Sequence, residues 1–173
     1  MSSAMIPAIW RTLGARGWAT LRFNFRGAGR SEGGYGEGIA ELKDVAAAFS
    51  FMREEVPSVP LAAAGWSFGS IVGFHAAAMD EQVVSYVAVA PPASVKPRMQ
   101  LPLLPVPERL AGWDGRLLAI CGTQDGFCTP SGLRRWAAEI PGAEVRIFEG
   151  EDHFFTSGRD ELATTVADFI AEA

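Results

Sequence analysis

The sequence contains few of the side chains that bind metals or form disulfides. Its 173 residues include two cysteines, Cys121 and Cys128, and two histidines, His75 and His153. A separation of seven positions between the cysteines fits neither a redox Cys-x-x-Cys motif nor a paired zinc-ligand pattern. We therefore expect no metal site and no cofactor, and we interpret both cysteines as small apolar residues.

Long apolar runs and concentrations of positive charge are also missing. The longest apolar segments, such as residues 61–66, have the length of a strand and are too short to cross a bilayer as a helix. Fifteen Lys and Arg against twenty Asp and Glu give a net charge of −5, without a basic run to follow a phosphate backbone. The opening residues carry neither a charged leader nor an apolar signal core. These absences predict a cytoplasmic protein that binds neither nucleic acid nor membrane.

What the sequence does contain is the pattern of a compact α/β protein. Hydrophobic residues make up 49% and charged residues 20%, and the length suits one domain spanning residues 1–173. Short apolar runs alternate with longer segments of helical period, which predicts a mostly parallel sheet of about five strands flanked by helices. The expected strands are residues 19–25, 61–65, 86–90, 116–121 and 144–148.

Three helices are expected from apolar side chains that recur at spacings of three and four. The stripes lie within residues 39–52, 133–140 and 162–170. Thr129 followed by Pro130 predicts an N-cap and first helical position for the second of them.

Two segments interrupt this alternation of strands and helices. Residues 26–36 are rich in glycine, but Glu32 stands where a dinucleotide-binding fingerprint has its third glycine, so a structural loop is favoured over a phosphate site. Residues 91–107 contain six prolines, which exclude a regular helix over most of that length. We expect a lid-like segment at about residues 91–109.

The strongest motif is Gly65-Trp66-Ser67-Phe68-Gly69, which follows an apolar strand and precedes a helix-like segment. In that context Gly-x-Ser-x-Gly predicts a sharp turn that strains the serine backbone and exposes its hydroxyl. Ser67 would then lie at the positive end of a helix, where developing negative charge is stabilised. The alternative is an ordinary turn serine.

A serine hydroxyl needs a base to activate it and a third group to orient that base. Asp125 and His153 each follow a predicted strand, which places both at the carboxyl edge of the sheet, and Ser–Asp–His is the chain order of the α/β-hydrolase fold. An ordinary Asp-Gly turn is the alternative for Asp125, since Asp114 and Asp152 also lie near strand ends. Asp114 precedes its strand and should lie at the opposite edge of the sheet. His75 falls in the helix after Ser67, so we expect the His75 side chain to point away from the serine hydroxyl.

Together these motifs resemble the α/β-hydrolase superfamily, particularly its small bacterial serine hydrolases and esterases. The resemblance includes residues 21–33 (Leu-Arg-Phe-Asn-Phe-Arg-Gly-Ala-Gly-Arg-Ser-Glu-Gly), Gly-Thr-x-Asp at 122–125 and Asp-His-Phe-Phe at 152–155, and it spans essentially the whole chain. It implies the triad roles for Ser67, Asp125 and His153. It also implies that the backbone N–H of Phe68 is one oxyanion donor.

The sequence departs from that family at its shortened N-terminus. Family members begin with strands and a loop that donates the second oxyanion N–H, whereas this sequence starts at the helix after that loop. We hypothesise that residues 19–25 pair directly with residues 61–65, so that a backbone N–H of Arg26 or Gly27 replaces the missing donor. The uncovered strand edge would also favour a homodimer.

The expected function is hydrolysis of small or short-chain carboxylic esters through an acyl-enzyme. Trp66, Leu103 and Leu104 are the candidate substrate contacts, although such residues often belong to the core or its rim. Thioesterase, peptidase or acyltransferase activity would use the same triad. A catalytically weak binding protein of the same fold is the alternative from another class.

Overall fold

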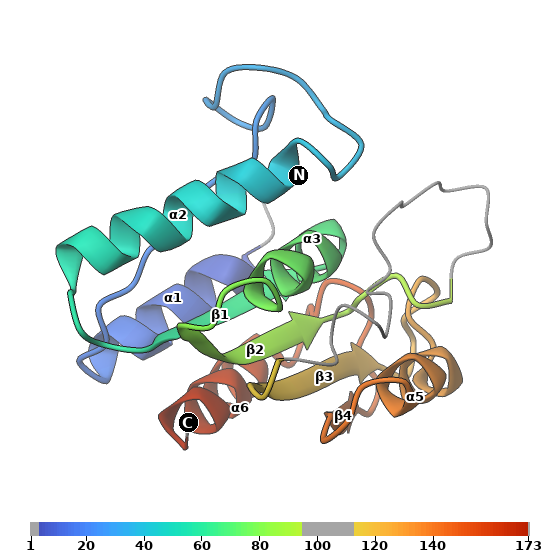
Figure 1. Ribbon diagram of the computed structural model, residues 1–173. Coiled ribbons are helices and arrows are strands. Elements are labelled where there is room, and N and C mark those ends of the chain that lie inside the picture. The colour runs from blue at the N-terminus through green and yellow to red at the C-terminus, as the bar shows by residue number, and fades with distance from the viewer. Residues whose placement is uncertain (1–3, 95–112, 173) are drawn as a thin grey trace.

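The computed structural model describes residues 4–94 and 113–172, which form a parallel sheet between two layers of helices (Figure 1). The described strands lie in the order β1-β2-β3-β4, and every neighbouring pair is parallel. Their bounds are β1 Leu61–Trp66, β2 Val83–Val89, β3 Arg116–Gly122 and β4 Glu144–Phe148. The register of β1 against β2 runs from Leu61 opposite Val83 to Trp66 opposite Val89, so the carboxyl ends of these strands share one edge.

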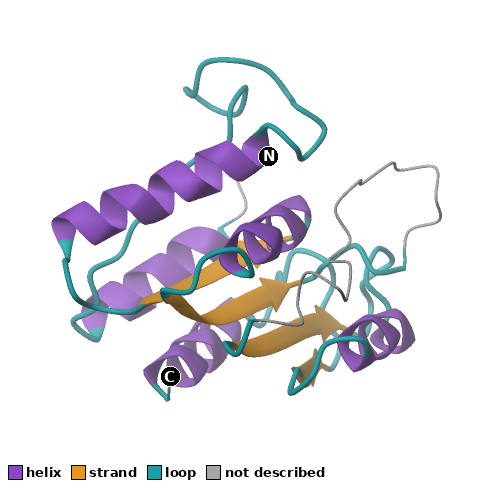
Figure 2. Ribbon diagram, in the orientation of Figure 1, coloured by secondary structure: helices purple, strands orange, loops and turns teal. Residues whose placement is uncertain are grey.

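The helices cover both faces of the sheet (Figure 2). On one face, α2, α3 and α5 bury side chains against Tyr86 and Leu117, and on the other α1 and α6 pack on Val87 and Leu118. The helix bounds are α1 Met5–Ala15, α2 Glu41–Glu55, α3 Phe68–Ala77, α5 Pro130–Ala138 and α6 Arg159–Ala171. The expected α/β class, with a parallel sheet flanked by helices, is confirmed.

The beginning of α5 follows from two adjacent residues. The side chain of Thr129 accepts a hydrogen bond from the Gly132 N–H at 3.2 Å, and Pro130 occupies the first helical position. Proline suits this position because its missing N–H would have no partner within the helix. The predicted cap is therefore confirmed.

The strand predicted at residues 19–25 is wrong, and so is its pairing with residues 61–65. Residues 19–25 carry no strand, and within the described chain β1 pairs only with β2. Residues 19–23 and 61–64 both line a cavity of about 560 Å³. Apolar alternation forms a strand only where a neighbouring strand supplies backbone hydrogen bonds, and among the described residues no strand pairs with this segment. Leu21 and Phe23 consequently remain 40% and 45% exposed.

The predicted lid lies almost wholly outside the described residues. Its first residues, up to Ser94, are described, and Ser94 Oγ accepts a hydrogen bond from the Thr129 N–H at 3.0 Å. Among the helices of the described ranges, none combines the length and apolar character needed to cross a membrane.

Candidate active site

Ser67 occupies a strained turn between β1 and α3. Its φ of 52° and ψ of −121° put a non-glycine residue at positive φ, a conformation that costs about 1–3 kcal/mol and persists only where the surroundings impose it. The Ser67 N–H donates to the Val89 carbonyl at 2.9 Å, and Ser70 Oγ–H donates to the Ser67 carbonyl. These bonds hold the serine at the carboxyl edge of the sheet.

Close packing requires a glycine at position 65, two residues before Ser67. A Cβ on Gly65 would collide with the Gly69 carbonyl and with the hydroxyl of Tyr86. That hydroxyl donates a hydrogen bond to the Gly69 carbonyl at 3.0 Å, and burial raises the pKa of Tyr86, so the group keeps the proton it donates. Tyr86 in β2 thus fixes the first turn of α3 behind the serine.

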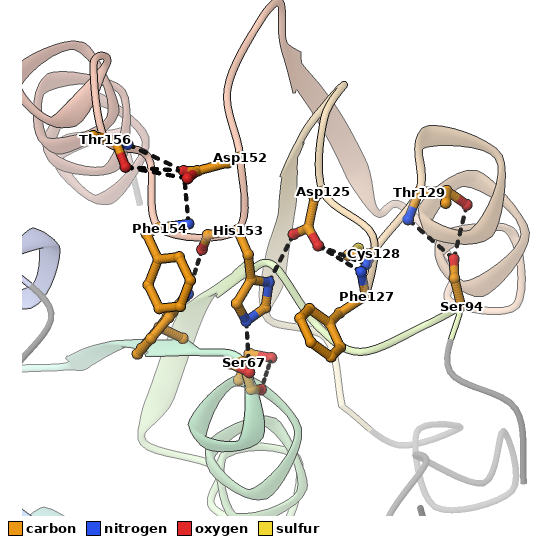
Figure 3. A network of polar contacts seen from close by, with 12 residues as sticks. Ser67, Ser94, Asp125, Phe127, Cys128, Thr129, Asp152, His153, Phe154 and Thr156 are labelled. Atoms are coloured by element: carbon orange, nitrogen blue, oxygen red, sulfur yellow. Dashed lines mark hydrogen bonds and ion pairs between the residues drawn. The ribbon is translucent and has the colours of Figure 1, made fainter. Parts of the chain in front are cut away.

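Ser67, His153 and Asp125 form a continuous hydrogen-bonded chain (Figure 3). His153 Nε2 lies 3.0 Å from Ser67 Oγ, and His153 Nδ1 lies 2.8 Å from Asp125 Oδ2. A carboxylate can only accept, so Nδ1 carries the imidazole proton and Nε2 accepts the serine hydroxyl. The structure therefore brings together the three residues that the sequence singled out, in the arrangement that activates an alcohol.

The aspartate is fixed by the backbone of its own loop. Asp125 Oδ1 accepts hydrogen bonds from the N–H groups of Phe127 at 2.8 Å and Cys128 at 2.9 Å, which leaves Oδ2 facing the imidazole. The Asp125 side chain has no exposed surface and that of His153 is 10% exposed. Water is thus largely excluded from this pair, which strengthens the interaction between them.

The competing candidates do not join this chain. Asp152 Oδ1 accepts hydrogen bonds from the Phe154 and Thr156 N–H groups, and Asp114 precedes β3 at the opposite edge of the sheet. His75 is buried within α3 and is 4% exposed.

The N–H groups predicted from the sequence as oxyanion donors lie in different parts of the fold. The Phe68 N–H belongs to the first turn of α3, directly after the nucleophile. The Arg26 N–H instead donates to Asp44 Oδ2 at 3.0 Å, and the Gly27 N–H donates to the Glu32 carbonyl at 3.0 Å. The hypothesis that Arg26 or Gly27 supplies the second donor is therefore corrected, because the Arg26 N–H is bound to a carboxylate of α2 and the Gly27 N–H to a carbonyl of its own loop.

The glycine-rich loop is anchored to α2 by two carboxylates. The Arg26 guanidinium lies 2.6 Å from Asp44, an ion pair that raises the pKa of Arg26 and lowers that of Asp44. Glu41, which is 1% exposed, accepts the N–H groups of Gly36 at 2.7 Å and Gly38 at 2.8 Å. These hydrogen bonds from the loop already go to carboxylates. A structural role for the loop therefore fits the contacts better than a phosphate-binding role.

The three residues predicted to contact the substrate differ in where the structure places them. Trp66 is partly buried, its ring lies 5.3 Å from that of His153, and its Nε1–H donates to the His153 carbonyl at 2.9 Å, so it positions the histidine. Leu103 and Leu104 lie outside the described residues. Phe127 and Phe154, which flank His153, were not singled out from the sequence, although each lies within two positions of a triad residue.

The two cysteines belong to the core. Both Cys121 and Cys128 are free thiols with no exposed surface, in the cluster beneath α3 and α5. In the described ranges no group of three or more His, Cys, Asp or Glu side chains is placed to hold a metal ion.

Comparison with solved structures places this fold among the α/β hydrolases. The chain is 25% identical to the protein of unknown function ATU1826 from Agrobacterium tumefaciens, over 98% of this chain and 77% of that one, with a TM-score of 0.82. An α/β serine hydrolase homologue from Coxiella burnetii gives the same identity and coverage, with a TM-score of 0.80. Est1E from Butyrivibrio proteoclasticus, solved with bound ferulic acid, matches 97% of this chain and 82% of its own at 17% identity and a TM-score of 0.85, which shows the fold alone.

A family model extends the likeness from fold to sequence. The model for the serine aminopeptidases S33 matches residues 2–118, a range that contains the strained serine turn and both strands beside it. That match covers more than half of the 173 residues. The chain is therefore a member of the serine aminopeptidase S33 family of α/β hydrolases.

Proposed function

We propose that the protein hydrolyses small or short-chain carboxylic esters through an acyl-enzyme intermediate. The observation that carries the proposal is the 3.0 Å contact between Ser67 Oγ and His153 Nε2, with Asp125 behind the imidazole. Ser67 Oγ attacks the ester carbonyl while His153 Nε2 takes the hydroxyl proton. The Phe68 N–H stabilises the carbonyl oxygen as it becomes negative.

The remaining steps return every group to its starting state. His153 delivers the proton to the leaving alcohol as the carbon–oxygen bond to that alcohol breaks, and the acyl group stays on Ser67. Water then attacks the acyl-enzyme, with Nε2 taking one of its protons. The carboxylic acid is released as the proton returns to Ser67 Oγ.

We infer a preference for esters over amides because the Phe68 N–H is the one oxyanion donor that we assign among the described residues. The loss of one such donor typically lowers turnover by about 10²–10³-fold. An alcohol is a better leaving group than an amine, so ester hydrolysis tolerates that loss more easily. Peptide hydrolysis is the second candidate, favoured by the aminopeptidase family to which the chain belongs. Thioester hydrolysis and acyl transfer would proceed through the same acyl-enzyme.

We expect a fluorophosphonate probe to label the folded protein at one serine. Mass spectrometry of the digested adduct should place the phosphonyl group on the peptide that contains Ser67, because His153 activates that hydroxyl. A heat-denatured sample provides the control. Absence of labelling in the folded protein would contradict the proposal and favour a binding protein of the same fold.

The substrate class is then tested with nitrophenyl esters of rising acyl length beside amino-acid nitroanilides. The proposal predicts the highest kcat/KM for acetate and butyrate esters, and at least tenfold lower values for the nitroanilides. A preference for nitroanilides would instead identify a peptidase.

We also propose that the protein forms a homodimer through the open edge at β1. The cavity beside β1 is bordered by apolar side chains that water reaches, namely Trp10 and Trp18 at 38% exposure, Leu21 at 40% and Phe23 at 45%. Apolar residues grouped at a sheet edge are typical of interfaces. Light scattering should show twice the 18.5 kDa chain mass and a monomer for Phe23→Lys. A monomeric wild type at high concentration would contradict the dimer.

A further inference from the structure

Two phenylalanine rings flank the imidazole of the candidate active site. The ring centroids of Phe127 and Phe154 lie 4.9 Å and 5.5 Å from that of His153, at interplanar angles of 53° and 89°. Figure 3 shows the two rings on either side of His153. They come from separate loops, one after β3 and one after β4, so tertiary folding alone brings them together.

Both rings face solvent, in contrast to the phenylalanine that follows one of them. Phe127 is 48% exposed and Phe154 is 41% exposed, whereas the next residue, Phe155, is fully buried. The backbone holds the two exposed rings in place, because the Phe127 N–H donates to Asp125 at 2.8 Å and the Phe154 N–H donates to Asp152 at 3.0 Å. The loops that fix the triad therefore also fix these two rings at its surface.

The two rings lie where the alcohol half of an ester would bind. In the proposed mechanism, His153 Nε2 gives its proton to the leaving alcohol. The alcohol oxygen must therefore come within hydrogen-bond reach of Nε2. The first carbons of the alcohol then lie beside the imidazole and between Phe127 and Phe154. The carboxylates nearest to this place are already occupied, since Asp125 binds His153 and Asp152 binds its own loop. The alcohol part therefore meets apolar, aromatic surface.

We propose that Phe127 and Phe154 bind the alcohol part of the ester and favour an aromatic alcohol over an aliphatic one of equal size. This inference rests on the proposed ester hydrolysis and adds which half of the substrate is recognised. A ring entering beside them makes aromatic contacts of the kind that they already make with His153, which are tilted for Phe127 and edge-to-face for Phe154. Such contacts stabilise beyond what apolar burial supplies, which corresponds to about a 2- to 10-fold preference.

The test compares phenethyl acetate with cyclohexylethyl acetate. These esters share the acyl group, and their alcohols are close in size and acidity, so the ratio of the two kcat/KM values reports ring recognition rather than reactivity. We expect phenethyl acetate to be preferred by about 2- to 10-fold. Ethyl phenylpropanoate against ethyl cyclohexylpropanoate places the same ring on the acyl side, where a ratio near one is expected.

Variants then assign the preference to particular side chains. Phe127→Leu and Phe154→Leu keep an apolar side chain and should bring the alcohol-side ratio towards one, whatever they do to the overall rate. Phe51→Leu is the matched control, because Phe51 is 49% exposed on α2, which leads to the opposite edge of the sheet, and it should keep the wild-type ratio. A wild-type ratio of one, or a ratio unchanged in both variants, overturns the inference while ester hydrolysis itself stands. Failure of the folded protein to hydrolyse any ester overturns both proposals.

Discussion

Replacement of Ser67 by alanine is expected to lower kcat for nitrophenyl acetate by about 10⁴- to 10⁶-fold. The change removes the atom 3.0 Å from His153 Nε2, so the imidazole has no hydroxyl to deprotonate and no acyl-enzyme forms. The oxyanion donor and the binding surface remain, which leaves a small residual rate. Initial rates of ester hydrolysis at saturating substrate measure the effect.

Two further variants make this result interpretable. Ser50→Ala removes a hydroxyl from α2, where Ser50 Oγ accepts a hydrogen bond from Arg53 at 3.3 Å, and it should keep the wild-type rate. Ser67→Gly also lacks the hydroxyl but relieves the positive φ of 52°, so it should be inactive and about 1 kcal/mol more stable to unfolding. Retention of more than a tenth of the activity in Ser67→Ala would show that another group is the nucleophile.

The second large effect is expected for Asp125→Asn, which should lower kcat by about 10⁴-fold without unfolding the protein. The N–H groups of Phe127 and Cys128 already hold one side-chain oxygen, so the asparagine carbonyl keeps that place and its NH₂ group turns towards His153. His153 Nδ1 must then accept, and the imidazole proton moves to Nε2. A protonated Nε2 cannot take the proton of Ser67.

The other aspartates near strand ends supply the comparison. Asp114→Asn and Asp152→Asn should each keep kcat within about tenfold of wild type, since neither carboxylate contacts the imidazole. Thermal unfolding of all three variants shows whether a loss of activity comes from the wrong imidazole tautomer in a folded protein or from loss of the fold. If Asp152→Asn caused the largest loss of activity, the assignment of Asp125 would be wrong.

Local patterns were sufficient for most of the fold. The strands β1 to β4 and the cap of α5 follow from apolar runs and from Thr129-Pro130, signals that lie within a few residues of the element they predict. Residues 19–25 show the limit of such signals. Their alternation has the period of a strand, but no strand of the described ranges pairs with them. A strand exists only as part of a sheet, so its own sequence cannot guarantee it.

The candidate site likewise contains features that local sequence patterns predict and features that they do not. Ser67, Asp125 and His153 could be selected from the sequence because each follows an apolar strand, and parallel strands end at one edge. The failure of Arg26 and Gly27 as oxyanion donors could not be foreseen, because their N–H groups are taken by Asp44 and Glu32, contacts that depend on how the loop folds.

By itself, the sequence determined which residues are the candidates for catalysis and at which edge of the sheet they lie, because strand period, turn residues and chain order can be read along the chain. Only the tertiary structure decided that Phe127 and Phe154 border the imidazole and that β1 is an open edge. Both features arise from contacts between segments far apart along the chain. Such contacts depend on the three-dimensional packing of the whole molecule, which no single segment encodes.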